Sequence, residues 1–284
     1  CRLSGNNRQY YYRNKKVRES KRVLANHVLE RVIAIRSRMP RIGTRKLHYM
    51  LSCQGVDYDI GRDKLFKIMR ANNLDIKPRR AYHVTTNSHH RFRKHKNLVD
   101  KLNIIRPEQV WVSDITYIGT RGSHCYLALI TDAYSKKIVG YDLSDSLSAQ
   151  GAIRALKTAL KNRMYQDKAL IHHSDREIQY CCDDYQKLLK KYNIKVSMTE
   201  SYNPYANAVA ERVNGILKNE FLLEEYKVDK KSMELIVGQS IRYYNQFRPH
   251  MSCSLLTPIQ MHSQEKISVK TYKKISVQKG NFLN

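Results

Sequence analysis

Three carboxylates occupy positions where an acid is costly unless it is paired or binds a cation. Asp114 interrupts a β-rich run at residues 110–118, Asp175 follows a short apolar run at residues 169–173, and Glu211 lies inside a helical pattern. The run around Asp114 contains no basic residue. A divalent cation is therefore the simplest way to neutralise this strand acid.

Carboxylate oxygens suit Mg²⁺, which binds a few carboxylates together with water and substrate phosphates. Two such ions ~3.5–4 Å apart stabilise the attacking and leaving oxygens of a phosphodiester displacement. The alternative is that the three acids are unrelated, because Asp132, Asp142 and Asp183 are equally plausible candidates by spacing alone. The residue types favour metal-assisted phosphodiester chemistry without excluding that alternative.

The elements predicted around these acids form an α/β domain. Three β-rich runs in close succession indicate an antiparallel meander, at residues 110–118, 125–132 and 137–143. Helices and short strands then alternate: a helix from Ser148, a strand at 169–173, a helix at 183–193, a strand at 195–198 and a helix from Asn207. This order predicts a mixed sheet flanked by helices. Asp175 then follows the carboxyl end of a strand, where open α/β sheets bind ligands.

The helix that contains Glu211 has a narrow polar stripe. At about 100° per residue, four polar side chains fall within an arc of about 60°: Asn207, Glu211, Asn214 and Lys218. The opposite side is apolar, with Val209, Val213, Ile216 and Leu217. Asn207 can cap this helix after the turn at Asn203-Pro204. Taken alone, the stripe is most simply interpreted as a solvated helix face.

The net charge of +27 implies a polyanionic partner. Residues 1–109 contain 27 of the 52 basic residues and 8 of the 25 acids, a net charge of +19. The first third of the chain should therefore supply most of the electrostatic affinity. Charge alone leaves the partner open, since ribosomal and membrane-surface proteins are also basic.

Short helices are predicted at the N-terminus: one ending near residue 22, and others at residues 23–39, 44–51 and 60–73. Asp59 is the expected N-cap of the last helix. Two short helices around a turn with Gly55, the second one basic, are typical of a helix-turn-helix. In that interpretation Arg62, Lys64 and Lys67 contact DNA. The alternative is a small helical bundle with a basic surface.

Residues 76–99 contain seven Lys or Arg, four His and no acid. This composition predicts an extended basic linker that lies along a phosphate backbone. The predicted contacts are Arg79, Arg80, Arg91, Arg93 and Lys94. The histidines lack a metal-ligand pattern and are interpreted as polar linker residues.

The six cysteines include no Cys-x-x-Cys pair and no Cys/His spacing typical of zinc, which predicts reduced thiols in the cytoplasm. No apolar run approaches ~18 residues, so no membrane-spanning segment is predicted. The sequence begins with Cys1 rather than Met, which predicts a fragment or part of a longer translation product.

The segments around the three acids resemble the signature of the retroviral-integrase-like transposases. They read WVSDITY at 111–117, HHSDREIQY at 172–180 and NPYANAVAERVNG at 203–215. Between Asp175 and Glu211 lie 35 residues, the spacing of that superfamily. YNQFRPH at 244–250 and LTP at 256–258 are similar to the end of its catalytic domain. The chain resembles in particular the second-frame product of bacterial insertion sequences of the IS-three group, over about residues 23–262.

The resemblance implies four regions: a helix-turn-helix-like DNA-binding domain at 1–75, a basic linker at 76–108, an integrase core at 109–262 and a basic tail at 263–284. The implied core is a ribonuclease-H-like, five-stranded α/β sheet in which Asp114, Asp175 and Glu211 bind two Mg²⁺ ions, with Mn²⁺ able to substitute. Asp114 would bridge both ions. Lys218 would hold a phosphate of the element end, with Asn207 and Asn214 as neighbouring DNA contacts.

Members of this family cut one 3′ end, join it to form a circle and insert the circle at a target. The implied partners are therefore the terminal repeats of the element and target DNA, bound by a homo-oligomer. An upstream-frame helix-turn-helix product, fused by frameshifting, is a further implied partner. Its presence would account for a start without Met.

The chain departs from the family pattern at Glu177, where Gly is usual, and at Ala206, where Asp is common. Glu177 adds an acid near the predicted metals, where it could weaken activity or point away. Two rival functions remain open at this point. One is a catalytically inactive DNA-binding protein derived from a decayed transposase, and the other is a structure-selective nuclease of the same fold.

Overall fold

The structure is a computed structural model that describes residues 8–53, 60–77, 95–100, 102–120, 123–199 and 208–264. Several predicted features lie outside these ranges: the turn with Gly55, Asp59, Ala206, Asn207, most of the C-terminal tail, and the linker residues Arg79, Arg80, Arg91, Arg93 and Lys94.

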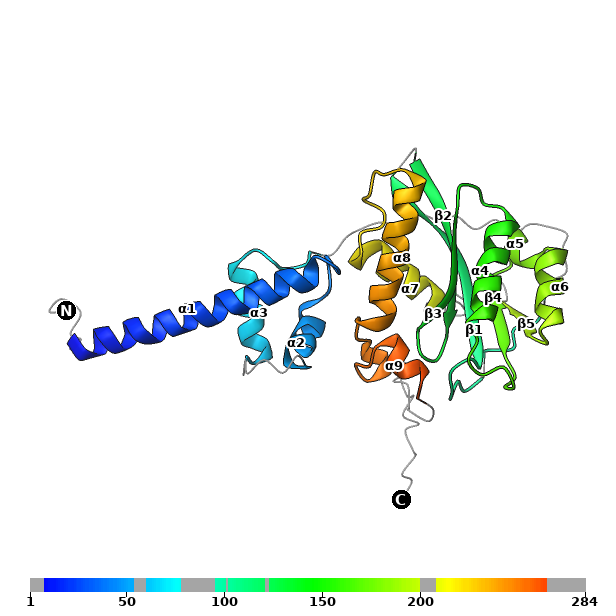
Figure 1. Ribbon diagram of the computed structural model, residues 1–284. Helices are drawn as coiled ribbons and strands as arrows, with labels where there is room; N and C mark the ends of the chain where they lie inside the picture. Colours follow the sequence, from blue (N-terminus) through cyan, green and yellow to red (C-terminus); the bar gives the residue numbers. More distant parts are fainter. Residues whose placement is uncertain are drawn as a thin grey trace, which may run out of the picture.

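The centre of the molecule is a mixed five-stranded sheet with the order β3-β2-β1-β4-β5 (Figure 1). The strands are β1 Val110–Thr120, β2 Ser123–Asp132, β3 Ile138–Ser144, β4 Ile171–Ser174 and β5 Lys195–Met198. The first three form the predicted antiparallel meander, and β4 and β5 add parallel strands on the other side of β1. The predicted mixed sheet is confirmed, with β1 at its centre.

Helices cover both faces of the sheet because successive strand residues point to opposite sides. On one face, Trp111 and Ile130 are buried with α4 (Ala149–Lys161), α5 (Ile178–Cys181) and α6 (Asp183–Lys191). On the other face, Leu127 and Leu129 are buried with α7 (Ala208–Glu220) and α8 (Lys230–Gln246). A short helix, α9 (Pro258–His262), follows the 3₁₀ turn Met251–Cys253. The helices α5, α8 and α9 were not predicted from the sequence.

The N-terminal helices are α1 (Arg8–Arg36), α2 (Thr44–Cys53) and α3 (Arg62–Ala71), here called the helical unit. The predicted break near residue 22 is wrong, since α1 is one continuous helix of 29 residues. Residues 8–22 contain neither Pro nor Gly, so nothing in them ends a helix. Val28, Val32 and Ile35 of α1 are buried, and its N-terminal half projects away from the rest of the molecule (Figure 1).

The predicted pair of short helices is present, although the second one starts later than expected. Gly61, in an extended conformation, is the N-cap of α3, so Asp59 does not have that role. Leu65 and Met69 face inward, while the basic side chains of α3 stay at the surface. In the part of the chain that the structure describes, no helix is long and apolar enough to cross a membrane.

Candidate active site

The pairing of β1 with β4 brings Asp114 and Asp175 together. In the parallel register of β1 and β4, Ser113 lies opposite Ser174. Asp114 is the next residue of β1, and Asp175 is the first residue after the carboxyl end of β4, so the two acids reach the same place beside the centre of the sheet. The two carboxylates are close enough to interact: after burial, the negative charge of Asp175 is the next largest effect that raises the pKa of Asp114.

Asn214 of α7 completes this arrangement from the helix side. Its amide nitrogen donates a 2.6 Å hydrogen bond to Oδ2 of Asp114, and the residue is only 5% exposed. The interpretation of the polar stripe as a solvated face is therefore wrong for Asn214. The side-chain amide nitrogen of Asn214 therefore orients the carboxylate of Asp114 and is not directed toward DNA.

Lys218 is also turned toward the sheet. Its ammonium lies 3.0 Å from Oε1 of Glu224 and 4.7 Å from the ring centroid of Tyr117, and its side chain is 19% exposed. A phosphate could bind Lys218 only by sharing the ammonium with Glu224 or displacing that carboxylate.

Glu211, the third predicted ligand, is an exposed residue in the first turn of α7. Its charge contributes to the raised pKa of Asp114, after burial and the charge of Asp175. Among the residues that the structure describes, no three His, Cys, Asp or Glu side chains lie close enough together to hold a metal ion. The fold thus joins Asp114 to Asp175 and leaves Glu211 at the edge of the site.

Glu177 is an acid of the site that the family pattern does not contain. It is the N-cap of α5, and its amide donates a 3.1 Å hydrogen bond to Oδ1 of Asp175. Its Oε2 is buried and has no hydrogen-bond partner. Burial raises the pKa of Glu177, and the charges of Asp175 and Asp114 raise it further. Glu177 therefore belongs to the electrostatics of the site.

The ionised forms of these acids are unfavourable without a cation. Burial raises the pKa of Asp114 to about 7, with a further contribution from the charge of Asp175, although the hydrogen bond from Asn214 opposes this shift. Burial also raises the pKa of Asp175, against the hydrogen bond from the amide of Glu177. A bound cation would relieve this repulsion.

The other candidate acids are bound elsewhere. Asp132 is buried and accepts hydrogen bonds from the amides of Glu108 and Ser135, both 2.7 Å long. Asp142 accepts two 2.8 Å hydrogen bonds from Arg154. Asp183 lies in the first turn of α6, where an acid suits the helix dipole. These interactions give each acid a structural role, which removes the main competitors of Asp114 and Asp175.

The predicted DNA contacts on α3 are all at the surface. Arg62, Lys64 and Lys67 are exposed, and Arg62 forms a 2.9 Å ion pair with the neighbouring Asp63. Figure 1 shows α3 among the N-terminal helices, apart from the sheet.

Asp114→Asn is expected to stabilise the cation-free protein at pH 8. The folded chain holds the Asp114 proton up to a pKa of about 7, against 3.8 ordinarily, so stability falls as pH rises between these values. An amide does not ionise and avoids this loss, which is at most ~4 kcal/mol and corresponds to several degrees in Tm. Thermal unfolding in EDTA should show the gain at pH 8 and less than half of it at pH 5. An equal gain at both pH values would contradict the assignment.

Comparison with known proteins defines the family. The integrase core domain family matches residues 105–204, and a second integrase core domain family matches residues 192–258. The insertion element IS600 uncharacterized 31 kDa protein of Shigella sonnei is 33% identical over 264 residues, which cover 91% of this chain and 95% of that protein. Transposase InsF for insertion sequence IS3A of Escherichia coli (strain K12) is 31% identical over 226 residues, covering 79% and 77%. The chain belongs to the transposases of bacterial insertion sequences.

The predicted resemblance to transposases of the IS-three group is thereby confirmed, and so is the predicted function as a transposase with an integrase core. Among solved structures, the simian T-cell lymphotropic virus intasome in complex with PP2A regulatory subunit B56 gamma has a TM-score of 0.50 at 15% identity, covering 84% of this chain and 77% of that chain. The HTLV-2 integrase catalytic core domain in complex with magnesium has a TM-score of 0.44 at 21% identity, covering 55% and 97%. The first of these likenesses supports the integrase-like fold of this transposase.

Proposed function

We propose that this transposase cleaves the ends of its insertion element and joins them to target DNA, with Asp114, Asp175 and Glu211 as ligands of two divalent cations. Mg²⁺ is the proposed ion, and Mn²⁺ can substitute. The observation that supports this most is that Asp114 of β1 and Asp175, directly after β4, each follow the last residue pair of these two parallel strands, Ser113 and Ser174. The groups that shift the pKa values of these two acids most include no basic residue.

The atoms around Asp114 suit a hard cation. Several buried side-chain oxygens in the described part of the chain have no hydrogen-bond partner there, and Oδ1 of Asn214 and Oε2 of Glu177 are among them. Carboxylate and amide oxygens are ligands that divalent cations such as Mg²⁺ accept. The unsatisfied acceptors and the mutual repulsion of the acids both favour a bound cation.

When bound, the two ions stabilise the attacking and leaving oxygens of phosphodiester displacement. Asp114 and Asp175 supply the negative charge that binds the ions, and Asn214 fixes the orientation of the Asp114 carboxylate. Glu211 lies one turn before Asn214 on α7 and completes the ligand set from the exposed side. Water is the proposed nucleophile for cleavage and a DNA 3′-OH for joining.

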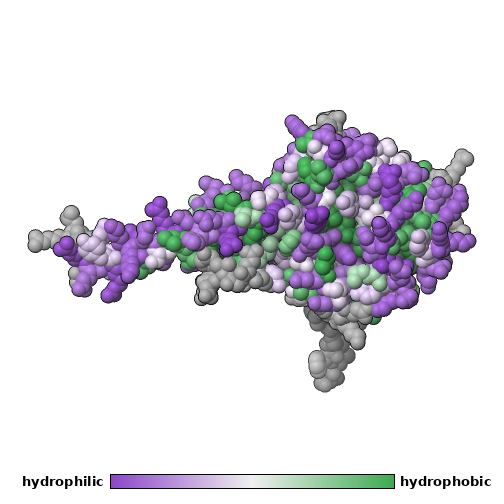
Figure 2. Space-filling view, in the orientation of Figure 1, coloured by the Kyte–Doolittle hydropathy of each residue, from purple (hydrophilic) through white to green (hydrophobic). Residues whose placement is uncertain are grey.

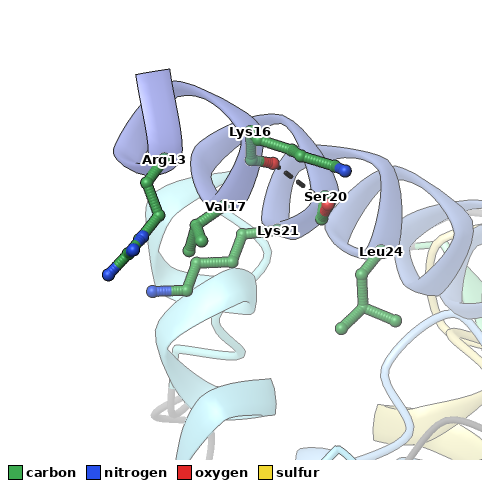
Figure 3. Close-up of a pocket in the computed structure, with 6 residues that line it drawn as sticks. All are labelled: Arg13, Lys16, Val17, Ser20, Lys21 and Leu24. Carbon is green, nitrogen blue, oxygen red and sulfur yellow. Dashed lines mark hydrogen bonds between the residues drawn. The ribbon is translucent and has the colours of Figure 1, made fainter. Parts of the chain in front are cut away.

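The helical unit is the proposed binding site for the element ends. Figure 2 shows mainly hydrophilic residues along the projecting half of α1. On that half, Arg13, Lys16 and Lys21 surround a shallow hollow of ≈ 380 Å³, which Val17 and Leu24 also line (Figure 3). Exposed cations at such density favour contact with phosphates.

We also propose that the helical unit binds DNA as a helix-turn-helix, that the chain divides at residues 75, 108 and 262, and that the basic linker contacts the phosphate backbone. A homo-oligomer is the proposed form that binds the terminal repeats and target DNA, and fusion to an upstream-frame product is proposed as well.

A strand-transfer assay tests the proposed function. The purified chain is incubated with a duplex that contains the matched ends of its element, a target plasmid and Mg²⁺, in parallel with EDTA. We expect joined product only with the divalent ion. Cleaved ends without joined product would favour a nuclease. No product from a folded, end-binding chain would favour the inactive, decayed form.

Lys218→Ala is expected to reduce the slope of log affinity against log salt by about 0.9, if Lys218 neutralises one phosphate of duplex DNA. Glu224→Gln frees the same ammonium and should tighten end binding, since it removes the competing carboxylate. Fluorescence anisotropy across a salt series measures both. An unchanged slope in Lys218→Ala would leave Lys218 as a structural partner of Glu224 and Tyr117.

A further inference from the structure

Glu220, the last residue of α7, binds both the helical unit and the core. Its Oε1 lies 2.8 Å from the ammonium of Lys46 on α2. The guanidinium of Arg248, beyond α8, donates two hydrogen bonds of 2.8 Å, one to each carboxylate oxygen of Glu220. The backbone carbonyl of Glu220 also accepts a 2.9 Å hydrogen bond from the amide of Arg41.

These groups are withdrawn from solvent. The side chains of Lys46, Glu220 and Arg248 are 13%, 17% and 2% exposed. Ion pairs of this kind are much less screened by salt than surface pairs. The ion pair between Lys46 and Glu220 therefore holds α2 against the end of α7 more firmly than an exposed ion pair would.

Apolar packing continues across the same boundary. Leu47 of α2 and Leu65 of α3 belong to one buried cluster with Leu217 of α7 and Val237 of α8. In addition, the guanidinium of Arg38 lies 5.4 Å from the ring centroid of Tyr243 on α8. The helical unit is thus docked on the two helices that cover one face of the sheet.

The docking point lies on the helix that contains Glu211. Glu220 follows Glu211 by nine positions, which is about 14 Å along an α-helix. Because α7 also provides Asn214, which binds Asp114, one rigid element connects the helical unit to the catalytic acids.

We propose that the contact between Lys46 and Glu220 is a joint that sets the position of the helical unit, and of the DNA end bound to it, relative to the catalytic site. This inference rests on the proposed function. It makes Lys46 a positioning residue, which selects where the element end is cut without touching the reacting atoms.

Lys46→Met is the informative variant because it breaks only one side of the joint. Glu220 keeps both hydrogen bonds from Arg248, so its buried charge remains paired and the core should stay folded. Lys46→Arg keeps the charge. Lys230→Met is the matched control, since it removes an ion pair of 2.7 Å to Asp145 that lies at the surface of the core.

The experiment has two measurements on the full chain. Hydrogen exchange without DNA should rise in residues 38–47 and 216–223 of Lys46→Met, because the hydrogen bond from the backbone amide of Arg41 to the carbonyl of Glu220 opens more often. With Mg²⁺ and the element ends, cleavage at the correct phosphate should fall by about 10–100-fold, and cuts should spread to neighbouring positions. End affinity should stay the same. Lys46→Arg should restore accurate cutting, and Lys230→Met should match the parent.

The parent should also lose accuracy above pH 8, whereas Lys46→Arg should not. Burial lowers the pKa of Lys46 to about 8, and the charge of Arg248 lowers it further, while Glu220 opposes this. The remaining groups around Lys46 keep their charge state in this range. Arg212 and Arg248 are guanidinium groups. Burial raises the pKa of Glu220, but Arg248 and Lys46 lower it by more, so Glu220 stays ionised. Burial lowers the pKa of His250, which keeps this imidazole neutral.

Unchanged hydrogen exchange in Lys46→Met would show that the contact between Lys46 and Glu220 does not hold the helical unit in place, and would overturn the proposal. An unchanged distribution of cuts, even with faster exchange, would overturn the positioning role and leave a contact that only stabilises the fold. If the parent itself produces no cut ends, the proposed function fails, and the positioning role fails with it. The contact between the helical unit and the core is still tested in that case, because hydrogen exchange is measured without DNA.

Discussion

Asp114→Asn is expected to lower cleavage and joining of element ends by about 10³-fold or more. The amide has nearly the shape of the carboxylate but lacks the negative charge that a divalent cation requires at the centre of the sheet. Single-turnover assays with Mg²⁺ would measure the loss. End binding should be unchanged or slightly tighter, since removing an acid near a DNA backbone removes repulsion.

Asp145→Asn is a suitable control because its carboxylate is exposed and pairs with Lys230 at the surface of the core. It should cleave like the parent. Asp175→Asn should resemble Asp114→Asn, and Glu211→Gln tests whether the exposed acid of α7 is needed as well. Joined product from Asp114→Asn at a tenth of the parent rate would exclude this residue as a cation ligand.

Affinity for the element ends is expected to fall about 10³–10⁵-fold between ~50 and ~200 mM salt, the behaviour of a protein that neutralises about 6–10 phosphates. Replacing the three exposed cations of α3, Arg62, Lys64 and Lys67, should reduce the salt slope by about 0.9 for each phosphate that is no longer neutralised. Titrations of the full chain are required, because the apolar residues of the helical unit share a buried cluster with α7 and α8. A fragment without the core would expose that surface.

The matched control replaces Lys187, Lys190 and Lys191, three exposed cations of α6 on the far side of the core in Figure 1. Both triple variants change the net charge equally, so only a specific contact surface distinguishes them. Equal slopes in the two variants would mean that α3 has no privileged contact with DNA. Base preference that persists without the α3 cations would argue against a recognition role for this helix.

The sequence by itself determined the local elements and the family. Three β-rich runs predicted β1 to β3 closely, because their side-chain types suit a pleated, buried surface. The short runs at 169–173 and 195–198 predicted β4 and β5 to within about two residues. The 35-residue interval before Glu211 and the segments around each acid indicated an integrase core, and the relatives confirmed it. Element ends were less accurate: α1 continued through residue 22, and α3 began at Arg62 instead of near Ile60.

Only the tertiary structure decided which side chains meet. Asn214 binds an acid 100 residues away, and Lys46 binds a carboxylate 174 residues away. Helical periodicity placed Asn214 and Lys218 on a polar stripe, but it could not say that this stripe faces β1. Such contacts depend on strand register and helix packing, which bring together residues that no local pattern relates. The acids of the site follow from the sequence, whereas their orientation and their connection to the helical unit follow from the fold.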